Sequence, residues 1–162
     1  MQWLIELETE NDPIPACRLI NIFRRKGVKI VTMGLAAKVE GFSIVALVET
    51  AETEVDHIFN FLRRTQGVRD VTCYRHETSG EPAYVFADTN ADASSVKRIL
   101  QAFPDAGLIF AIQGKYFFEV PAGGGSRWAA LNHGAPGILP FARFRVARGV
   151  PRQELVAVLP ER

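Results

Sequence analysis

The acidic residues near the start of this chain are the first group whose types and spacing could do chemistry. Glu8, Glu10 and Asp12 alternate with other residues and could together offer carboxylate oxygens to a divalent cation. The same spacing is typical of a solvated turn between a strand and a helix, where negative charge is favourable near the helix N-terminus. We favour this second interpretation, so the sequence predicts no metal site here.

The histidines and cysteines lack the neighbours that catalysis or metal binding would require. No nucleophile with its base, paired carboxylates or metal-binding motif surrounds His57, His76 or His133. Two cysteines cannot build a zinc site alone, and Cys17 and Cys73 show no C-x-x-C spacing. We expect two buried free thiols, while a disulfide stays open because the sequence supplies no geometry. The chain is therefore expected not to be an enzyme.

Two weaker patterns could indicate other ligands. The run Gly123-Gly124-Gly125-Ser126 precedes a predicted helix and could expose amides to a phosphate, but no Gly-Lys-Ser or Gly-Lys-Thr follows. A flexible connection is the favoured interpretation. The segment 41–45 faintly resembles the signature strand of RNA-recognition modules, yet Glu40 stands where those modules carry a basic residue. Binding of single-stranded RNA is therefore disfavoured.

Composition excludes further classes of function. The chain has 162 residues, a net charge of +1, 48% hydrophobic and 23% charged residues, and a pI of about 7.8. This balance gives no general attraction to nucleic acid, and no apolar run approaches the roughly 18 residues of a membrane span. We therefore expect neither nucleic acid nor membrane as a partner. The N-terminus turns acidic at once, unlike a targeting segment, so the cytoplasm is the expected location.

The elements that would position these residues begin with a strand and a helix. Residues 2–9 have the two-residue period of a half-buried strand, with Glu6 and Glu8 on its polar face. A helix is predicted from Pro13 until Gly27, and Asn11 or Asp12 can cap it. A two-stranded hairpin, a second helix and a closing strand follow, at 28–39 and 42–50, 51–66, and 68–73. This β-α-β-β-α-β order is the ferredoxin-like arrangement.

The second half of the chain repeats this order less clearly. Residues 75–82 are polar and contain Gly and Pro, so we divide the chain into a domain at 1–77, a linker at 78–82 and a domain at 83–162. In the second domain Ser126 is expected to cap a short helix. The predicted strand, helix, hairpin, short helix and last strand lie at 83–88, 93–103, 108–112 and 116–120, 126–131, and 138–147. The expected class is α+β, with one ferredoxin-like domain followed by a second, also ferredoxin-like.

Several blocks in the first half carry a resemblance to a known family. They are Glu10-Asn11-Asp12, Arg18-Leu19-Ile20-Asn21-Ile22-Phe23, Arg25-Lys26-Gly27-Val28-Lys29-Ile30 and Thr32-Met33-Gly34-Leu35-Ala36-Ala37. The first three fit, without gaps, a pattern of the type E-N-x-x-G-x-L-x-R-V-x-G-L-F-x-x-R-G-Y-N-I. With these blocks, residues 1–77 resemble the ACT domain of the small, regulatory subunit of acetolactate synthase, also called acetohydroxyacid synthase.

The resemblance implies a non-catalytic subunit that pairs its ACT domains edge to edge in a homodimer. Such a subunit binds and activates the catalytic acetolactate synthase subunit of branched-chain amino-acid biosynthesis, and it can confer feedback by valine. Thiamine diphosphate, Mg and FAD would belong to that catalytic partner, so no cofactor is expected in this chain. The resemblance places a branched-chain amino-acid effector against six candidate residues, which are Asn11, Asp12, Ile14, Pro15, Lys29 and Ile30.

Two departures from the family pattern bear on that effector. Ile14 replaces a glycine that lets the backbone approach the ligand carboxylate, and Pro13 and Pro15 each remove an amide donor from the same turn. Lys29 replaces an asparagine that can both donate and accept a hydrogen bond. We therefore expect valine feedback to be altered or absent.

Two other functions stay open. One is a freestanding ACT-type sensor that binds an amino acid or another metabolite and controls an unrelated enzyme. The other is an adaptor that has kept the fold and lost the ligand. Recovery of a thiamine-diphosphate enzyme with this protein would favour the regulatory subunit, and calorimetry with valine, leucine and isoleucine would separate a sensor from an adaptor.

Overall fold

Local hydrophobic periods decide the elements of the first half of the chain. The computed structural model describes residues 1–131 and 135–149, so the expectations for His133 and residues 150–162 lie outside the described residues. One face of the first helix buries Leu19, Ile22 and Phe23 at the three-to-four-residue spacing of an amphipathic helix, whereas Ile20 is 44% exposed. The elements are β1 (Gln2–Thr9), α1 (Ile14–Lys26), β2 (Lys29–Lys38), β3 (Gly41–Glu49), α2 (Glu52–Leu62) and β4 (Val68–His76).

The second half repeats the same order of elements. Its helix α3 buries Ile99, and the adjoining Phe103 is fully buried. The elements are β5 (Tyr84–Asp88), α3 (Ser95–Ala102), β6 (Gly107–Ile112), β7 (Lys115–Glu119), α4 (Gly125–Leu131) and β8 (Ile138–Ala147). The α+β class expected from the sequence is confirmed.

All strands in the described part of the chain belong to one antiparallel sheet with the order β2-β3-β1-β4-β8-β5-β7-β6. Each half contributes four neighbouring strands, and in each half the first and third strands of the sequence lie side by side at the centre. The halves join where β4 pairs with β8, in a register that sets Val71 opposite Ala147 and His76 opposite Phe141. The two edges of the sheet are β2 and β6.

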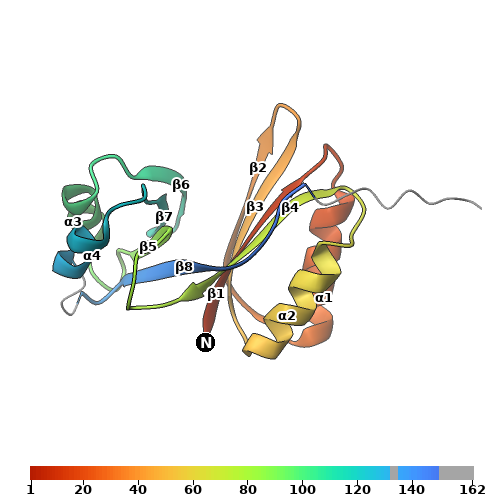
Figure 1. Ribbon diagram of the computed structural model, residues 1–162, viewed down its shortest axis with the longest axis horizontal. Coiled ribbons are helices and arrows are strands. Elements are labelled where there is room, and N and C mark those ends of the chain that lie inside the picture. Colours follow the sequence, from red (N-terminus) through yellow and green to blue (C-terminus); the bar gives the residue numbers. More distant parts are fainter. Residues whose placement is uncertain (132–134, 150–162) are drawn as a thin grey trace, which may run out of the picture.

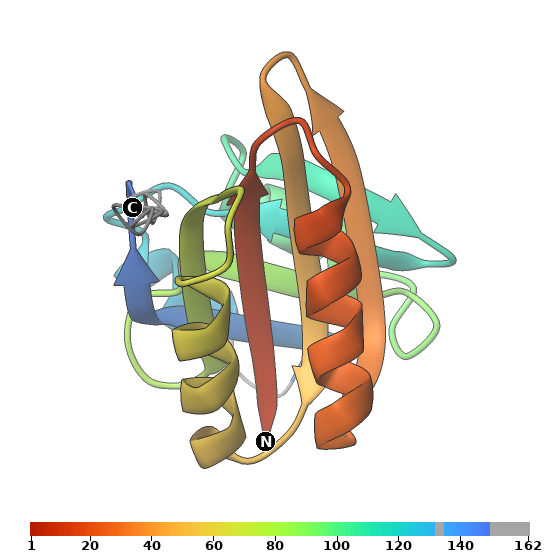
Figure 2. The ribbon, with the colours of Figure 1, turned by 90° about the vertical axis from the view of Figure 1, so that its right-hand side faces the viewer.

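The sheet folds over at this junction, so its two halves lie face to face with the helices outside (Figure 1). In Figure 2, α1 and α2 lie in front of the first four strands, and the second half of the sheet crosses behind them. One hydrophobic core fills the space under α1 and α2, and another lies under α3 and α4. A third core joins the helix-free faces of the two halves through Leu4, Val45, Leu47, Tyr74, Tyr84, Phe86, Phe117 and Phe141.

Several expected boundaries are corrected near the predicted effector loop. Helix α1 begins at Ile14 rather than Pro13, and its N-cap residue is Pro13, although the Asp12 side chain accepts a hydrogen bond from the amide of Ile14. The hairpin turns at Val39 and Glu40, one residue earlier than expected. A Cβ on Gly41 would lie 1.8 Å from the carbonyl oxygen of Thr9, so only glycine fits where β3 begins.

Other corrections concern the second half and the cysteines. Strand β4 continues to His76 instead of ending at Cys73, because β8 pairs with its last residues. Ser126 lies inside α4 rather than capping it. Both cysteines are free, but only Cys73 is buried, while Cys17 is exposed.

None of the helices in the described part of the chain has both the length and the apolar character that crossing a bilayer requires.

Candidate functional site

The loop between β1 and α1 and the first turn of α1 hold four of the six predicted effector residues. Asn11 is exposed, Ile14 is 51% exposed, and Pro15 is buried. Asp12 Oδ1 accepts a hydrogen bond of 2.8 Å from the amide of Ile14. Because Pro13 and Pro15 have no amide hydrogen, this bond uses one of the few donors that the turn could offer to a ligand carboxylate.

The other two predicted effector residues, Lys29 and Ile30, are the first two residues of β2 and lie away from this loop. Lys29 Nζ lies 2.7 Å from Glu49 Oε2 on the neighbouring strand, and Ile30 is 41% exposed. The hydrogen bond from Lys29, followed by one from Gln2, holds the pKa of the Glu49 carboxyl below its usual range. The ammonium group of Lys29 is therefore already paired within the chain.

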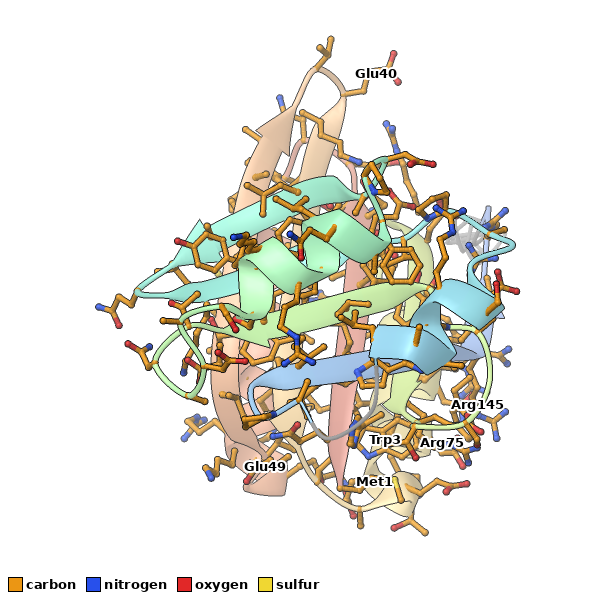
Figure 3. All side chains as sticks on the ribbon, turned by 90° about the vertical axis from the view of Figure 1, so that its left-hand side faces the viewer. Met1, Trp3, Glu40, Glu49, Arg75 and Arg145 are labelled. Atoms are coloured by element: carbon orange, nitrogen blue, oxygen red, sulfur yellow. The ribbon has the colours of Figure 1, made fainter. Side chains whose placement is uncertain are left out.

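These two groups of predicted residues lie at opposite ends of the first half of the sheet. Thr9, next to the loop, pairs with Phe42, whereas Lys29 pairs with Glu49 at the other end of β3. Phe42 and Glu49 are seven residue steps apart along β3, or about 23 Å at the usual rise per residue. Figure 3 shows the same separation, with Glu40 at one end of the molecule and Glu49 at the other. One chain does not bring the six residues together, and their effector role stays a prediction.

The acidic residues at the end of β1 and in the loop that follows it have partners that explain them without a metal. Glu8 Oε1 lies 2.8 Å from Lys38 Nζ, and Asp12 accepts the Ile14 amide. Within residues 1–131 and 135–149, no group of three or more His, Cys, Asp or Glu side chains is placed to hold a metal ion.

Sequence patterns missed a polar cluster between the two layers. The hydroxyl of Tyr74 donates to Glu6 Oε2 at 2.7 Å, and the hydroxyl of Tyr84 donates to Glu6 Oε1 at 3.1 Å. The two rings meet edge to face, with centroids 4.7 Å apart. Burial, followed by the nearby Glu6 carboxylate, raises the pKa of both phenols. One carboxylate thus connects the first half of the chain with the second.

A second cluster surrounds the junction of the halves on the helix-covered side. The ring of Phe144 meets Trp3 edge to face at 5.1 Å, and the guanidinium groups of Arg75 and Arg145 lie 5.5 and 5.3 Å from its centroid. Figure 3 shows Trp3, Arg75 and Arg145 close together. Arg145 also forms an ion pair with Asp56 of α2. These contacts hold β8 against the first half of the chain, so we assign them a structural role.

The two edges of the sheet meet in an apolar surface. A cavity of about 280 Å³ lies between β2 and β6, with Met33 and Leu35 on one side and Phe110 and Ile112 on the other. A Cβ on Gly34 would lie 3.0 Å from the Phe110 ring, so the two strands approach closely here. We call the exposed side chains of Leu35, Leu108, Ile109 and Ile112 the β2–β6 edge surface; their exposed fractions are 54%, 55%, 39% and 48%.

Another cleft, of about 670 Å³, opens at one end of the second half, where Tyr84, Asp105, Gly107, Glu119 and Arg143 line it. Tyr84 therefore takes part in both the inter-layer cluster and the wall of this cleft. None of the six predicted effector residues lines either of the two cavities described here.

Comparison with known proteins shows similarity in structure rather than in sequence. No family model matches the chain, and no curated protein matches it. Protein BT0572 from Bacteroides thetaiotaomicron is similar over 85% of this chain and 91% of its own, with a TM-score of 0.53 and 8% identity. This likeness shows a shared fold.

Two further solved structures are similar at lower scores. The small subunit of acetolactate synthase from Thermotoga maritima matches with a TM-score of 0.42 and 17% identity, over 91% of this chain and 95% of its own. The regulatory subunit of aspartate kinase from Thermus thermophilus matches with a TM-score of 0.43 and 12% identity, over 82% and 90%. At these scores the two similarities support no conclusion beyond the fold shared with protein BT0572.

Proposed function

We propose that this protein is a non-catalytic regulatory subunit that binds and activates the catalytic subunit of acetolactate synthase. In this proposal the chain consists of an ACT domain at 1–77 and a second ferredoxin-like domain at 83–162, joined by a linker at 78–82. The sequence blocks that resemble the family support the choice of partner. They fall on the loop after β1, on α1 and on β2, and Gly27 follows α1 in the left-handed conformation with φ 63°.

The observation that carries a docking function is the β2–β6 edge surface. Strands β2 and β6 end the sheet, so each has one side with backbone donors and acceptors that no strand within residues 1–131 and 135–149 pairs. Exposed Leu35, Leu108, Ile109 and Ile112 lie along the same edges. Unpaired strand edges with apolar side chains are suited to binding another protein.

The same topology restricts how a homodimer would form. In this chain β4 of the first unit already pairs with β8 of the second. The two units are thus joined edge to edge within one chain, as the family resemblance implies for two copies. A homodimer in this proposal uses β2 or β6 instead.

We propose further that valine feedback through the opening loop is altered or absent. The amide of Ile14 is bonded to Asp12, Lys29 is paired with Glu49, and about 23 Å of strand separates the two places. A ligand the size of valine cannot contact both groups in one chain.

Co-purification with the catalytic subunit tests the proposal. The tagged full chain is co-expressed with the acetolactate synthase catalytic subunit of its own organism, and synthase activity is measured with and without it. We expect co-elution and a rise in activity, both lost in the double variant L35E/I109E. The matched control is V39E, because Val39 is fully exposed at the hairpin tip and lies outside the edge surface. Separate elution at high concentration would contradict the proposal.

The freestanding sensor is the second candidate, and the cleft lined by Glu119 and Arg143 is the observation that favours it. A sensor would bind its metabolite without any synthase subunit present. Ligand binding combined with failure to co-purify would select this candidate.

A further inference from the structure

The cleft at one end of the second half has a floor without helix cover. Register places Glu119 opposite both Tyr84 and Gly107, so these three residues share one face of the sheet. Tyr84 belongs to the core between the layers, which identifies this as the face that looks toward the first half. A Cβ on Gly107 would meet nothing within 4 Å, so the floor is open at this point.

A cation lies across the floor from a carboxylate. Arg143 of β8 lies opposite Tyr74, another residue of the core between the layers, and therefore projects to the same side as Glu119. Strand β5 separates β8 from β7. Phe141 is the residue of β8 that lies level with Glu119, and Arg143 lies two residues further along β8. Two strand spacings and two residue rises put the Cα atoms of Arg143 and Glu119 about 12 Å apart.

The charges that line the cleft are not neutralised by one another. Among the described residues, Arg143, Glu119 and Asp105 form no ion pair within 4.0 Å. A fourth charged residue, Glu81, is engaged differently, because its Oε1 accepts hydrogen bonds from the amides of Gly123 and Gly124. The cleft therefore offers one guanidinium and two separate carboxylates to a ligand.

The remaining wall is apolar. Pro82, Val120, Pro121 and Ala122 line the same cleft. Such a wall favours an aliphatic group over a charged one. A small ligand that carries one positive and one negative group would complement the guanidinium and the carboxylates of the cleft.

We infer that this cleft binds a small aliphatic α-amino acid, with the ligand carboxylate on Arg143 and the ligand ammonium on Glu119 and Asp105. Acidic amino acids are excluded because two carboxylates already line the cleft. As the effector site of a regulatory subunit, this inference rests on the proposed function, although its geometry does not. Tyr84 joins the cleft wall to Glu6 of β1, which gives a bound ligand a direct contact route to the first half.

Calorimetric titration of the full chain with valine and two analogues tests each end of the ligand. Valinamide lacks the carboxylate and N-acetylvaline lacks the ammonium. We expect valine to bind about tenfold or more tightly than either analogue, and glutamate not to bind. R143Q should abolish the preference for valine over valinamide, and E119Q the preference over N-acetylvaline.

Matched controls are R148Q and E52Q, which change exposed residues outside the cleft and should leave the preferences unchanged. The inference is overturned if valine does not bind, or if its binding is unaffected by R143Q and E119Q. If either of these two results is found together with co-elution of the synthase subunit, the cleft is not an amino-acid site, and the proposed regulatory function still holds. Binding with the expected preferences, but without co-elution, would support the cleft and contradict the regulatory function.

Discussion

The hydroxyl of Tyr84 on β5 donates a hydrogen bond to the carboxylate of Glu6 on β1, at 3.1 Å and across 78 positions of sequence. Tyr74 on β4 donates to the other oxygen of the same carboxylate. A charged acceptor strengthens each hydrogen bond relative to a neutral one. This carboxylate is therefore a polar fastening between the two layers, within a core that is otherwise made of aliphatic and aromatic side chains.

Replacing Glu6 with glutamine should lower the free energy of unfolding by about 1.5–3 kcal/mol, because an amide loses the charge and presents one acceptor instead of two. Y84F should cost about 1 kcal/mol, since Tyr74 still satisfies part of the carboxylate. Urea denaturation measures both. In a double-mutant cycle, E6Q and Y84F should be non-additive, and additive values would show that the bond contributes nothing to stability.

The tyrosines should respond to high pH in an unusual way. Because burial and Glu6 raise the pKa of Tyr74 and Tyr84, the folded state holds these protons at a pH where the unfolded chain, with a phenol pKa of about 10, releases them. Stability should therefore fall as pH rises above about 10. Absorbance of tyrosinate near 295 nm, recorded on native and urea-unfolded protein, measures this. Full ionisation of every tyrosine in the native protein near pH 10 would contradict it.

His76 should give an opposite dependence at mildly acidic pH. Burial lowers the pKa of this imidazole below 6.5, so below that pH the unfolded chain binds a proton that the folded protein does not. Stability is lost as pH falls from 6.5 toward the folded pKa. Denaturation curves between pH 7.5 and 5.5 should show a smaller loss for H76Q than for the natural sequence. NMR titration gives the imidazole pKa itself, and a value at or above 6.5 would be inconsistent with this account.

The two thiols should differ in reactivity. Cys17 is exposed, whereas burial raises the pKa of Cys73 to about 12. Cys73 therefore stays in the protonated thiol form, which is unreactive. In the folded protein a disulfide reagent should modify one thiol promptly, and both after unfolding. The C17S variant should leave no promptly reactive thiol, which makes it the control for C73S.

Close approach of the sheet edges should make Gly34 intolerant of a side chain. A Cβ there would press on the ring of Phe110, which packs on Phe117 with centroids 4.8 Å apart. G34V should lower the free energy of unfolding by about 1–3 kcal/mol, and F110A should relieve part of that loss. G107A is the control, because Gly107 has open space at its Cβ position. Equal effects of G34V and G107A would rule out the contact.

Many helices and strands could be predicted from the local sequence, because their hydrophobic residues recur every two residues in strands and every three to four residues in helices. Residues 2–9 were expected to form a strand and do so as β1. The alternation did not reveal that Glu6 and Leu4 face a second layer of sheet rather than water. That layer comes from residues nearly eighty positions away, and a period says nothing about what will cover a face.

The candidate site shows the same limit. The loop before α1 was recognisable because Asn11, Asp12 and the following helix are contiguous in sequence. Arg143 and Glu119, in contrast, lie on different strands, and only the strand order brings them to one cleft. Lys29 shows the opposite case. The family pattern groups Lys29 with the loop before α1, but the register of β3 places Lys29 and that loop at opposite ends of the strand.

The insertion of β8 between β4 and β5 sets an order of events during synthesis of the chain. The first half can emerge from the ribosome and form its own core, yet its β4 edge has no partner until residues 138–147 have been translated. Nascent chains therefore pass through a stage with a nine-residue strand open to pairing with any neighbour. Late completion of the sheet makes β8 the natural element for exchange between two copies at high expression, and slow translation before residue 138 would lengthen the period of exposure.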